Sequence, residues 1–139
     1  MNPTPNDRQV GGQHYASTYQ HWDFVNDTDL GYFEAQITRY VSRSRKKNGL
    51  QDLEKAKHYV EKLRSLYSMS KVIPRRGSFV SPVQRFAFEN QLSQAETWAI
   101  DRITHWEKDI HLVQLIDHLD RMIAEHPTKA YVDQGREAS

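Results

Sequence analysis

Residues 30–63 read LGYFEAQITRYVSRSRKKNGLQDLEKAKHYVEKL and carry the clearest helical pattern of the chain. Apolar residues recur in this stretch at steps of three and four, which puts them on one stripe of a helix. Asn48-Gly49 interrupts the pattern, and such a pair favours a left-handed helix stop. We therefore expect an antiparallel hairpin of two helices, over about residues 30–47 and 50–70. The first helix has three candidate N-terminal caps, Asp27, Thr28 and Asp29.

A second pattern of the same kind follows in residues 83–127. Its helices are expected at about residues 83–90, 93–108 and 110–125. Ser93 and Glu96 have the spacing of a capping box at the start of the middle helix. The two hairpins resemble each other when Ile37 is aligned with Ile100. An internal duplication would explain this, although any two amphipathic hairpins align to a similar degree. With or without a duplication, the sequence predicts an all-α fold, a helical bundle built from two helical hairpins.

An irregular N-terminal arm is expected over residues 1–28, because this part has two prolines, a Gly-Gly pair and no sustained period. We expect the arm to dock through its aromatic side chains, which are Tyr15, Tyr19, Trp22 and Phe24. The rest of the chain divides into a hairpin at 29–71, a linker at 72–82, further helices of the same domain at 83–127 and a flexible tail at 128–139.

The composition indicates one soluble domain of 139 residues, with 37% apolar and 27% charged residues. No stretch reaches the roughly 18 apolar residues of a membrane span, and the N-terminus has no apolar core of a signal peptide. The chain has no cysteine, which excludes a disulfide framework and a thiolate metal site. We therefore expect a cytoplasmic protein that has no membrane partner.

The net charge of +1 conceals two unlike halves. Residues 1–76 hold 13 Lys and Arg against 8 Asp and Glu, a net charge of +5, whereas residues 77–139 hold 6 against 10, a net charge of −4. This division indicates either an anionic ligand on the first half or packing of the halves against each other. Chance clustering of charge on solvated helices is the alternative.

A basic run is the strongest sign of chemistry, and it comprises Arg39, Arg43, Arg45, Lys46 and Lys47. These five cations repel one another unless an anion or another chain compensates them. Arg39 and Arg43 lie one helical turn apart, so their guanidinium groups can grip phosphate oxygens together. We therefore expect a ligand at Arg39 and Arg43, and solvent at the two lysines.

The second candidate feature is the Gly11-Gly12 pair followed by His14 and Tyr15. Two glycines let successive backbone N–H groups point at an anion, and His14 can donate or relay a proton. Four candidate acids lie near the first hairpin, namely Asp23, Glu34, Asp52 and Glu54. Asp52 is equally explained as an acid that stabilises a helix N-terminus.

Several sharper signatures are missing from the sequence. There is no Gly-x-x-x-x-Gly-Lys-Ser/Thr phosphate loop and no His-Glu-x-x-His zinc motif. No glutamate has another glutamate three residues later, which counts against an all-α pyrophosphohydrolase of the MazG type. An ordinary P-loop kinase is therefore excluded, and no metal site is predicted.

The chain resembles a tailed-phage family, catalogued as a domain of unknown function, that includes the small nucleotide kinase of T7-like phages. The resemblance covers about residues 9–66 and rests on VGGQHY at 10–15, WDF at 22–24, EAQITRYVSR at 34–43 and KNGLQDLEKAKHYVEKL at 47–63. It implies transfer of a phosphoryl group from a nucleoside triphosphate donor to a deoxynucleoside monophosphate, chiefly dTMP or dGMP. It also implies a homo-oligomer in the cytoplasm of an infected bacterium.

This chain departs from the family pattern at four positions. The family commonly has Glu-Gly-Asn where this chain has Glu34, Ala35 and Gln36. The methyl group of Ala35 leaves less room than glycine for a ligand to approach the backbone. The usual lysine before the tyrosine is Arg39 here, which keeps the charge. Ser44 stands between two arginines, where the family often has an aromatic residue that could stack on a base. These departures leave open whether the chain is catalytically active.

The resemblance and the residues together predict catalytic roles for His14, Glu34, Arg39 and Arg43. Substrate-binding roles are predicted for Gly11, Gly12, Tyr15, Trp22, Asp23, Gln36, Asp52 and Lys55. The arginines and Lys55 would clamp phosphates, and an aromatic residue of the arm would stack on the base. The acids would orient the acceptor or hold a magnesium ion that accompanies the nucleotide; no other cofactor is indicated.

Two other functions remain open at this point. The first is a nucleotide-binding or host-interaction phage protein that keeps the family scaffold without catalysis. The second is a nucleic-acid-binding module that uses the basic run, and its affinity would fall steeply with salt. The acidic second half argues against nucleic acid as a partner.

Overall fold

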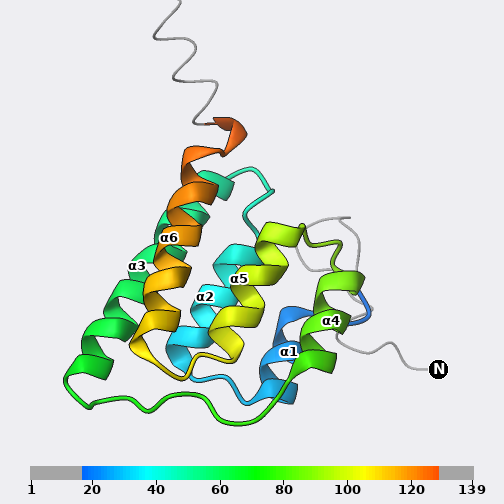
Figure 1. Cartoon of the computed structure of the whole chain (residues 1–139). Helices are drawn as coiled ribbons and strands as arrows, with labels where there is room; N and C mark the ends of the chain where they lie inside the picture. Colours follow the sequence, from blue (N-terminus) through cyan, green and yellow to red (C-terminus); the bar gives the residue numbers. More distant parts are fainter. Residues whose placement is uncertain (1–16, 129–139) are drawn as a thin grey trace, which may run out of the picture.

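The computed structural model describes residues 17–128, which form six α-helices (Figure 1). The helices are α1 (His21–Thr28), α2 (Tyr32–Ser42), α3 (Gly49–Ser68), α4 (Val80–Glu89), α5 (Gln94–Thr104) and α6 (Asp109–Ala124). No strand occurs within this part of the chain. The prediction of an all-α helical bundle is therefore confirmed.

Four of the helices form the centre of the bundle as two antiparallel hairpins, α2–α3 and α5–α6. Each helix of the first hairpin packs on its counterpart in the second, α2 on α5 and α3 on α6, while α1 and α4 pair at one side (Figure 1). The fully buried side chains come from all six helices and include Phe24, Ile37, Leu53, Phe86, Ile100 and Leu115. This pairing is the one that a duplicated hairpin would have, and the duplication itself stays a prediction.

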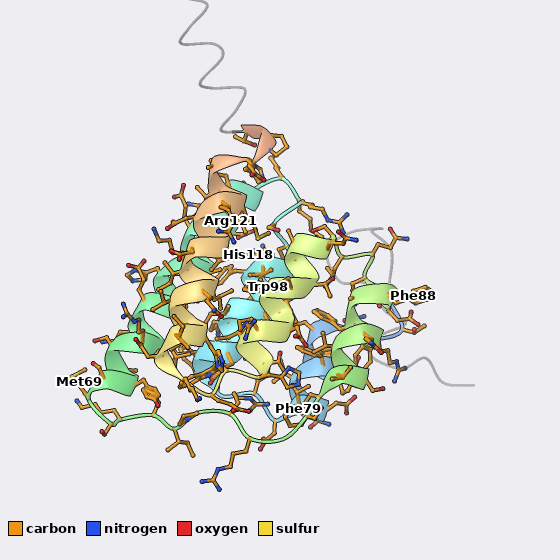
Figure 2. The ribbon with its side chains drawn as sticks, in the orientation of Figure 1. Met69, Phe79, Phe88, Trp98, His118 and Arg121 are labelled. Atoms are coloured by element: carbon orange, nitrogen blue, oxygen red, sulfur yellow. The ribbon has the colours of Figure 1, made fainter. Side chains whose placement is uncertain are left out.

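The aligned hairpins share one surface feature. Arg39 of α2 lies over the Tyr40 ring, and Arg102, its counterpart on α5, lies 5.0 Å from the centre of the Trp98 ring. The Trp98 ring also meets His118 of α6 at 4.4 Å, on the outer face of the second hairpin (Figure 2). Each hairpin thus carries an arginine that stacks on an aromatic ring.

The connection from α3 to α4 crosses the end of the bundle without helical structure (Figure 1). Arg75 fixes its middle, because its guanidinium group donates to the carbonyl oxygens of Thr28, Asp29 and Thr104. The linker expected at 72–82 is thus present as a non-helical segment, but α4 begins at Val80, inside the expected range.

The expectation of an irregular arm over residues 1–28 is wrong for residues 21–28, which form α1. Tyr19 and Phe24 are buried as expected, whereas Trp22 is 55% exposed and does not dock the segment. The Phe24 ring stacks on Phe86 of α4 at 4.7 Å. Tyr15 and the rest of residues 1–16 lie outside the described residues, as do residues 129–139 of the expected tail.

Two expected helix ends of the first hairpin are also wrong, namely the cap at the start of its first helix and the left-handed stop in the turn between its helices. Gly31 caps α2, while Asp29 ends α1 in a left-handed conformation with a φ of 51°. Gly49 is the first residue of α3 and does not have a positive φ; it is selected by a close backbone approach to Ser44. The capping box of Ser93 and Glu96 is confirmed, with Glu96 N donating to Ser93 Oγ at 3.1 Å.

The division of charge corresponds to ion pairs between the two halves of the chain. In the described residues, three pairs join a cation of the first half to an acid of the second: Arg45–Glu96, Lys57–Asp120 and Arg64–Asp109. Packing of the halves against each other thus accounts for part of the asymmetry. In the same part of the chain, no helix is long and apolar enough to cross a membrane.

Candidate functional site

Five of the predicted site residues share one face of the first hairpin, which we call the α2–α3 face. Helical spacing of three and four residues aligns the side chains of α2 and its C-cap on one side and those of α3 on the other. Because the helices are antiparallel, the end of α2 lies opposite the start of α3. The face comprises Gln36, Arg39, Tyr40, Arg43, Asp52, Lys55 and Tyr59.

The Tyr40 ring is the centre of this face. It stacks on the Tyr59 ring at 5.8 Å with an angle of 18° between the ring planes. Arg39 Cζ lies 5.8 Å from its centre and Lys55 Nζ lies 5.4 Å from it. Cations are attracted to the face of an aromatic ring by its quadrupole. The ring therefore brings a guanidinium group from α2 and an ammonium group from α3 to the same place.

Arg43 and Asp52 form the second element of the face. Arg43 Nε lies 3.9 Å from Asp52 Oδ2, and the Asp52 side chain is only 4% exposed. Asp52 is in the first turn of α3, where the helix dipole stabilises a negative charge. The contact printed for the pair involves Nε of Arg43, and the Arg43 side chain is 41% exposed, so part of the guanidinium group is accessible to a ligand. Asp52 is thus an acid of the helix N-terminus, as one reading of the sequence expected, and in addition it pairs with Arg43.

The face as a whole is short of negative charge. Arg39 and Lys55 are exposed and have no carboxylate partner within residues 17–128. Arg43 shares the one acid of the face, Asp52. Three cations against one carboxylate, with two half-buried tyrosine rings between them, favour an anionic ligand that also has a flat or apolar part.

His21 borders this face at the start of α1. Its Nε2 lies 2.8 Å from Thr38 Oγ1 of α2, and its ring is 5.8 Å from that of Phe86. Burial, followed by the positive charge of Arg39, lowers the pKa of His21 from 6.5 to about 4. The imidazole is therefore neutral at pH 7 and adds no charge beside Arg39.

The basic run is partly compensated within the chain. Arg43 pairs with Asp52, and Arg45 pairs with Glu96 of α5 at 2.7 Å. Lys46 and Lys47 are exposed, as expected. The repulsion that the sequence implies is thus relieved at Arg43 and Arg45 by acids of the same chain, whereas Arg39 has no carboxylate partner within residues 17–128.

Glu34 does not lie on the α2–α3 face, although it was predicted to be catalytic. Its side chain is buried, and Trp106 Nε1 donates to Glu34 Oε2 at 2.9 Å. Its other oxygen is next to Gly31, where a Cβ atom would be only 2.7 Å away. Five residues separate Glu34 from Arg39, which turns the two side chains about 140° apart around the helix. Glu34 therefore ties α2 to the segment between α5 and α6.

Glu34 also lines a groove of about 540 Å³ between the α1–α2 turn and the α3–α4 connection. The other lining residues include Tyr32, Phe33, Ile73, Arg75 and Phe79. Tyr32 connects this groove to the α2–α3 face, because its ring meets that of Tyr59 at 6.2 Å. A hydrogen bond with Tyr32 is the main cause that raises the pKa of Tyr59.

The remaining predicted residues are not brought to this face by the described structure. Trp22 lies exposed on α1, and Asp23 Oδ2 accepts a hydrogen bond from the backbone N–H of Gln20 at the start of that helix. Four predicted residues lie outside the described residues: Gly11, Gly12, His14 and Tyr15. Within residues 17–128 no group of three His, Asp or Glu side chains could hold a metal ion.

Sequence reasoning missed Tyr59, His21 and Glu96. Tyr59 is four residues after Lys55 and seven after Asp52, so helical spacing could have placed it on the same face. His21 and Glu96 act here through contacts with distant parts of the chain, and the capping-box spacing that marked Glu96 did not indicate its contact with Arg45.

Comparison with known proteins adds a family without an assigned activity. Residues 11–61 match the model of a family described as a protein of unknown function, DUF3310. The matched region contains α1, α2 and the first part of α3, and therefore the whole α2–α3 face. Neither the curated proteins nor the solved structures contain a match.

Proposed function

We propose that the chain is a nucleotide kinase that binds a deoxynucleoside monophosphate and a nucleoside triphosphate at the α2–α3 face. The observation that carries this proposal is the pairing of Arg39 and Lys55 at the Tyr40 ring, without a carboxylate partner for either in residues 17–128. Phosphate oxygens accept charge-assisted hydrogen bonds from such groups, and the tyrosine rings offer apolar surface to a base or sugar.

The proposed reaction needs little covalent chemistry from the protein. A phosphate oxygen of the monophosphate attacks the γ-phosphorus of the donor, and the bond from that phosphorus to the β,γ-bridging oxygen breaks. The products are a deoxynucleoside diphosphate and a nucleoside diphosphate, and no proton has to move because the attacking oxygen is already ionised at pH 7. Arg39, Arg43 and Lys55 would balance the charge of the transferred group.

Asp52 has a supporting role in this proposal. It is the one carboxylate of the α2–α3 face, and it pairs with Arg43, whose side chain stays 41% exposed. A single carboxylate fits a magnesium ion that is held mainly by the substrate phosphates. Glu34, hydrogen-bonded to Trp106, is no longer a candidate for binding the acceptor or the metal ion.

A second candidate function is nucleotide binding without catalysis. The specific observation in its favour is the position of Glu34, since its removal from the face leaves Asp52, already paired with Arg43, as the only acid there. The same face would then hold a nucleotide with the same residues. Turnover distinguishes the two functions.

The test is a binding screen followed by an activity assay. The four deoxynucleoside monophosphates are titrated into the purified protein, and heat release and thermal shift are measured. ATP, GTP and dTTP are then offered as donors, and nucleoside diphosphate formation is followed. Binding with turnover supports the kinase, and binding without turnover supports the second function. A protein that binds none of these nucleotides would contradict both.

A further inference from the structure

The turn between α2 and α3, residues 43–48, is held in place by the second hairpin. Ser44 Oγ donates to Glu96 Oε2 at 2.8 Å, and Arg45 Nε lies 2.7 Å from Glu96 Oε1. Glu96 is 1% exposed although it sits on α5, 52 residues along the chain from Ser44. A buried carboxylate is stable only when its oxygens are paired, so the turn and Glu96 depend on each other.

Two further contacts fix the same turn. His126 Nε2, beyond the end of α6, is 3.1 Å from the Ser44 carbonyl oxygen. Arg45 also donates to the carbonyl oxygen of Gln91, in the turn before α5. Ser44 and Arg45 directly follow Arg43, whose backbone N–H ends α2 by donating to Tyr40. The backbone on both sides of Arg43 is therefore anchored.

We infer that Glu96 is a positioning residue for Arg43, an inference that rests on the proposed function for its role in nucleotide binding. Within residues 17–128, the polar contacts of the Glu96 carboxylate are with Ser44, Arg45 and the backbone N–H of Ser93, which do not belong to the α2–α3 face. Glu96 acts on the turn, where it neutralises Arg45 and fixes Ser44, and the fixed turn directs the Arg43 side chain to Asp52 and to a phosphate. Without its negative charge, the cations of the turn repel one another and the turn samples other conformations.

This inference assigns a role to the second hairpin. The family match ends at residue 61, yet the turn inside it is held by Glu96 and His126, which lie outside it. Residues beyond the match thus complete the α2–α3 face without contributing to it directly.

The first test measures the turn itself and needs no ligand. Amide hydrogen exchange of residues 43–48 is compared in the wild type, Glu96→Gln and Ser44→Ala, below the unfolding temperature of each protein. We expect faster exchange in this turn, by roughly tenfold, in both variants. The matched control is Ile103→Val, which removes one methyl group from the buried face of the same helix. Equal exchange of the turn in Glu96→Gln and Ile103→Val would overturn the inference.

The second test is a double-mutant cycle on binding of dTMP and dGMP. Glu96→Gln alone is expected to weaken binding by roughly fivefold, and this effect should disappear when Arg43 is already alanine, because Glu96 acts through Arg43. Independent, multiplicative losses would contradict the positioning role. If the wild type binds neither nucleotide, the proposed function fails, and the hydrogen-exchange comparison still decides whether Glu96 holds the turn.

Discussion

Gly49 lies directly against the backbone of Ser44. A Cβ atom at position 49 would overlap the Ser44 carbonyl oxygen and lie 2.6 Å from its carbonyl carbon. It would also be 2.9 Å from His126 Nε2, the atom that hydrogen-bonds to the same oxygen. The turn from α2 to α3 therefore requires a residue without a side chain at the first position of α3.

Gly49→Ala should destabilise the protein by about 2–4 kcal/mol, because backbone atoms must shift to admit the methyl group. The free energy of unfolding in urea measures the effect. Gly31→Ala is the matched control: its Cβ would be 2.7 Å from Glu34 Oε1, an atom at the end of a side chain that can move. We expect a loss of about 1 kcal/mol there. Equal losses in the two variants would contradict this account of Gly49.

Arg39→Ala and Lys55→Ala should each weaken binding of a deoxynucleoside monophosphate about tenfold, since each removes a charge-assisted contact. Titration calorimetry provides the measurement. Lys47→Ala removes the same charge from an exposed position in the turn and should change affinity by less than about twofold. If Lys47→Ala weakens binding as much as Arg39→Ala, the ligand is held by general positive charge and not by the α2–α3 face.

Tyr40→Leu should lower both stability and nucleotide affinity, because the ring contacts Arg39, Lys55 and Tyr59 at once. Cation–π contacts at exposed sites contribute about 0.5–1 kcal/mol each, and a ring pair about the same or slightly more. We therefore expect a loss of about 1–3 kcal/mol in urea unfolding. Tyr40→Phe keeps the ring and should behave like the wild type, so a large loss in that variant would point to the hydroxyl group instead.

The stability of the protein should depend on the protonation of His21. The pKa of this residue is lowered to about 4 in the folded state, against 6.5 in the unfolded chain, so the unfolded chain binds more protons between these values. Its contribution is present above pH 6.5 and is lost as the pH falls toward 4, at about 1.4 kcal/mol for each pH unit.

Urea unfolding of wild type and His21→Gln from pH 4 to pH 7.5 measures this contribution. The difference between the two proteins should favour the wild type most at pH 7 and shrink toward pH 4. His58→Gln, an exposed position on α3, controls for the loss of a histidine as such. A difference between wild type and His21→Gln that is constant over the whole range would contradict the lowered pKa.

Glu34 should matter for stability and not for ligand binding. Trp106→Phe leaves Glu34 Oε2 without its donor and should cost about 1–3 kcal/mol in unfolding. Trp98→Phe, at a position that is 37% exposed, is the matched control and should cost less. Glu34→Gln should keep the nucleotide affinity of the wild type, and a tenfold loss of affinity in that variant would return Glu34 to the binding site.

The helices that the sequence located best are those with a long apolar stripe. For α3 and α6 the expected bounds differ from the observed ones by no more than two residues. The eight residues of α1 have only two buried positions, Phe24 and Thr28, and a single turn of spacing is too short to show a period. The sequence pattern indicated a left-handed helix stop at Gly49, and this was wrong. The glycine is required by a contact with the Ser44 backbone, and that contact forms only in the folded structure.

The candidate site was predictable to the extent that it lies on one hairpin. Spacing and antiparallel packing bring Arg39 and Arg43 together with Asp52 and Lys55. Glu34 was misjudged because the residue that buries it, Trp106, is 72 residues away in the sequence. Partners at such distances follow from how the hairpins pack, and no spacing rule within one hairpin contains them.

Within residues 17–128, the three ion pairs that join the halves all have the same direction, with the cation in the first half and the acid in the second half. This direction adds an electrostatic preference to the apolar packing between the two hairpins. Two copies of the first half would bring like charges together, and so would two copies of the second half. The charges therefore favour pairing of a first hairpin with a second hairpin over pairing of two identical halves.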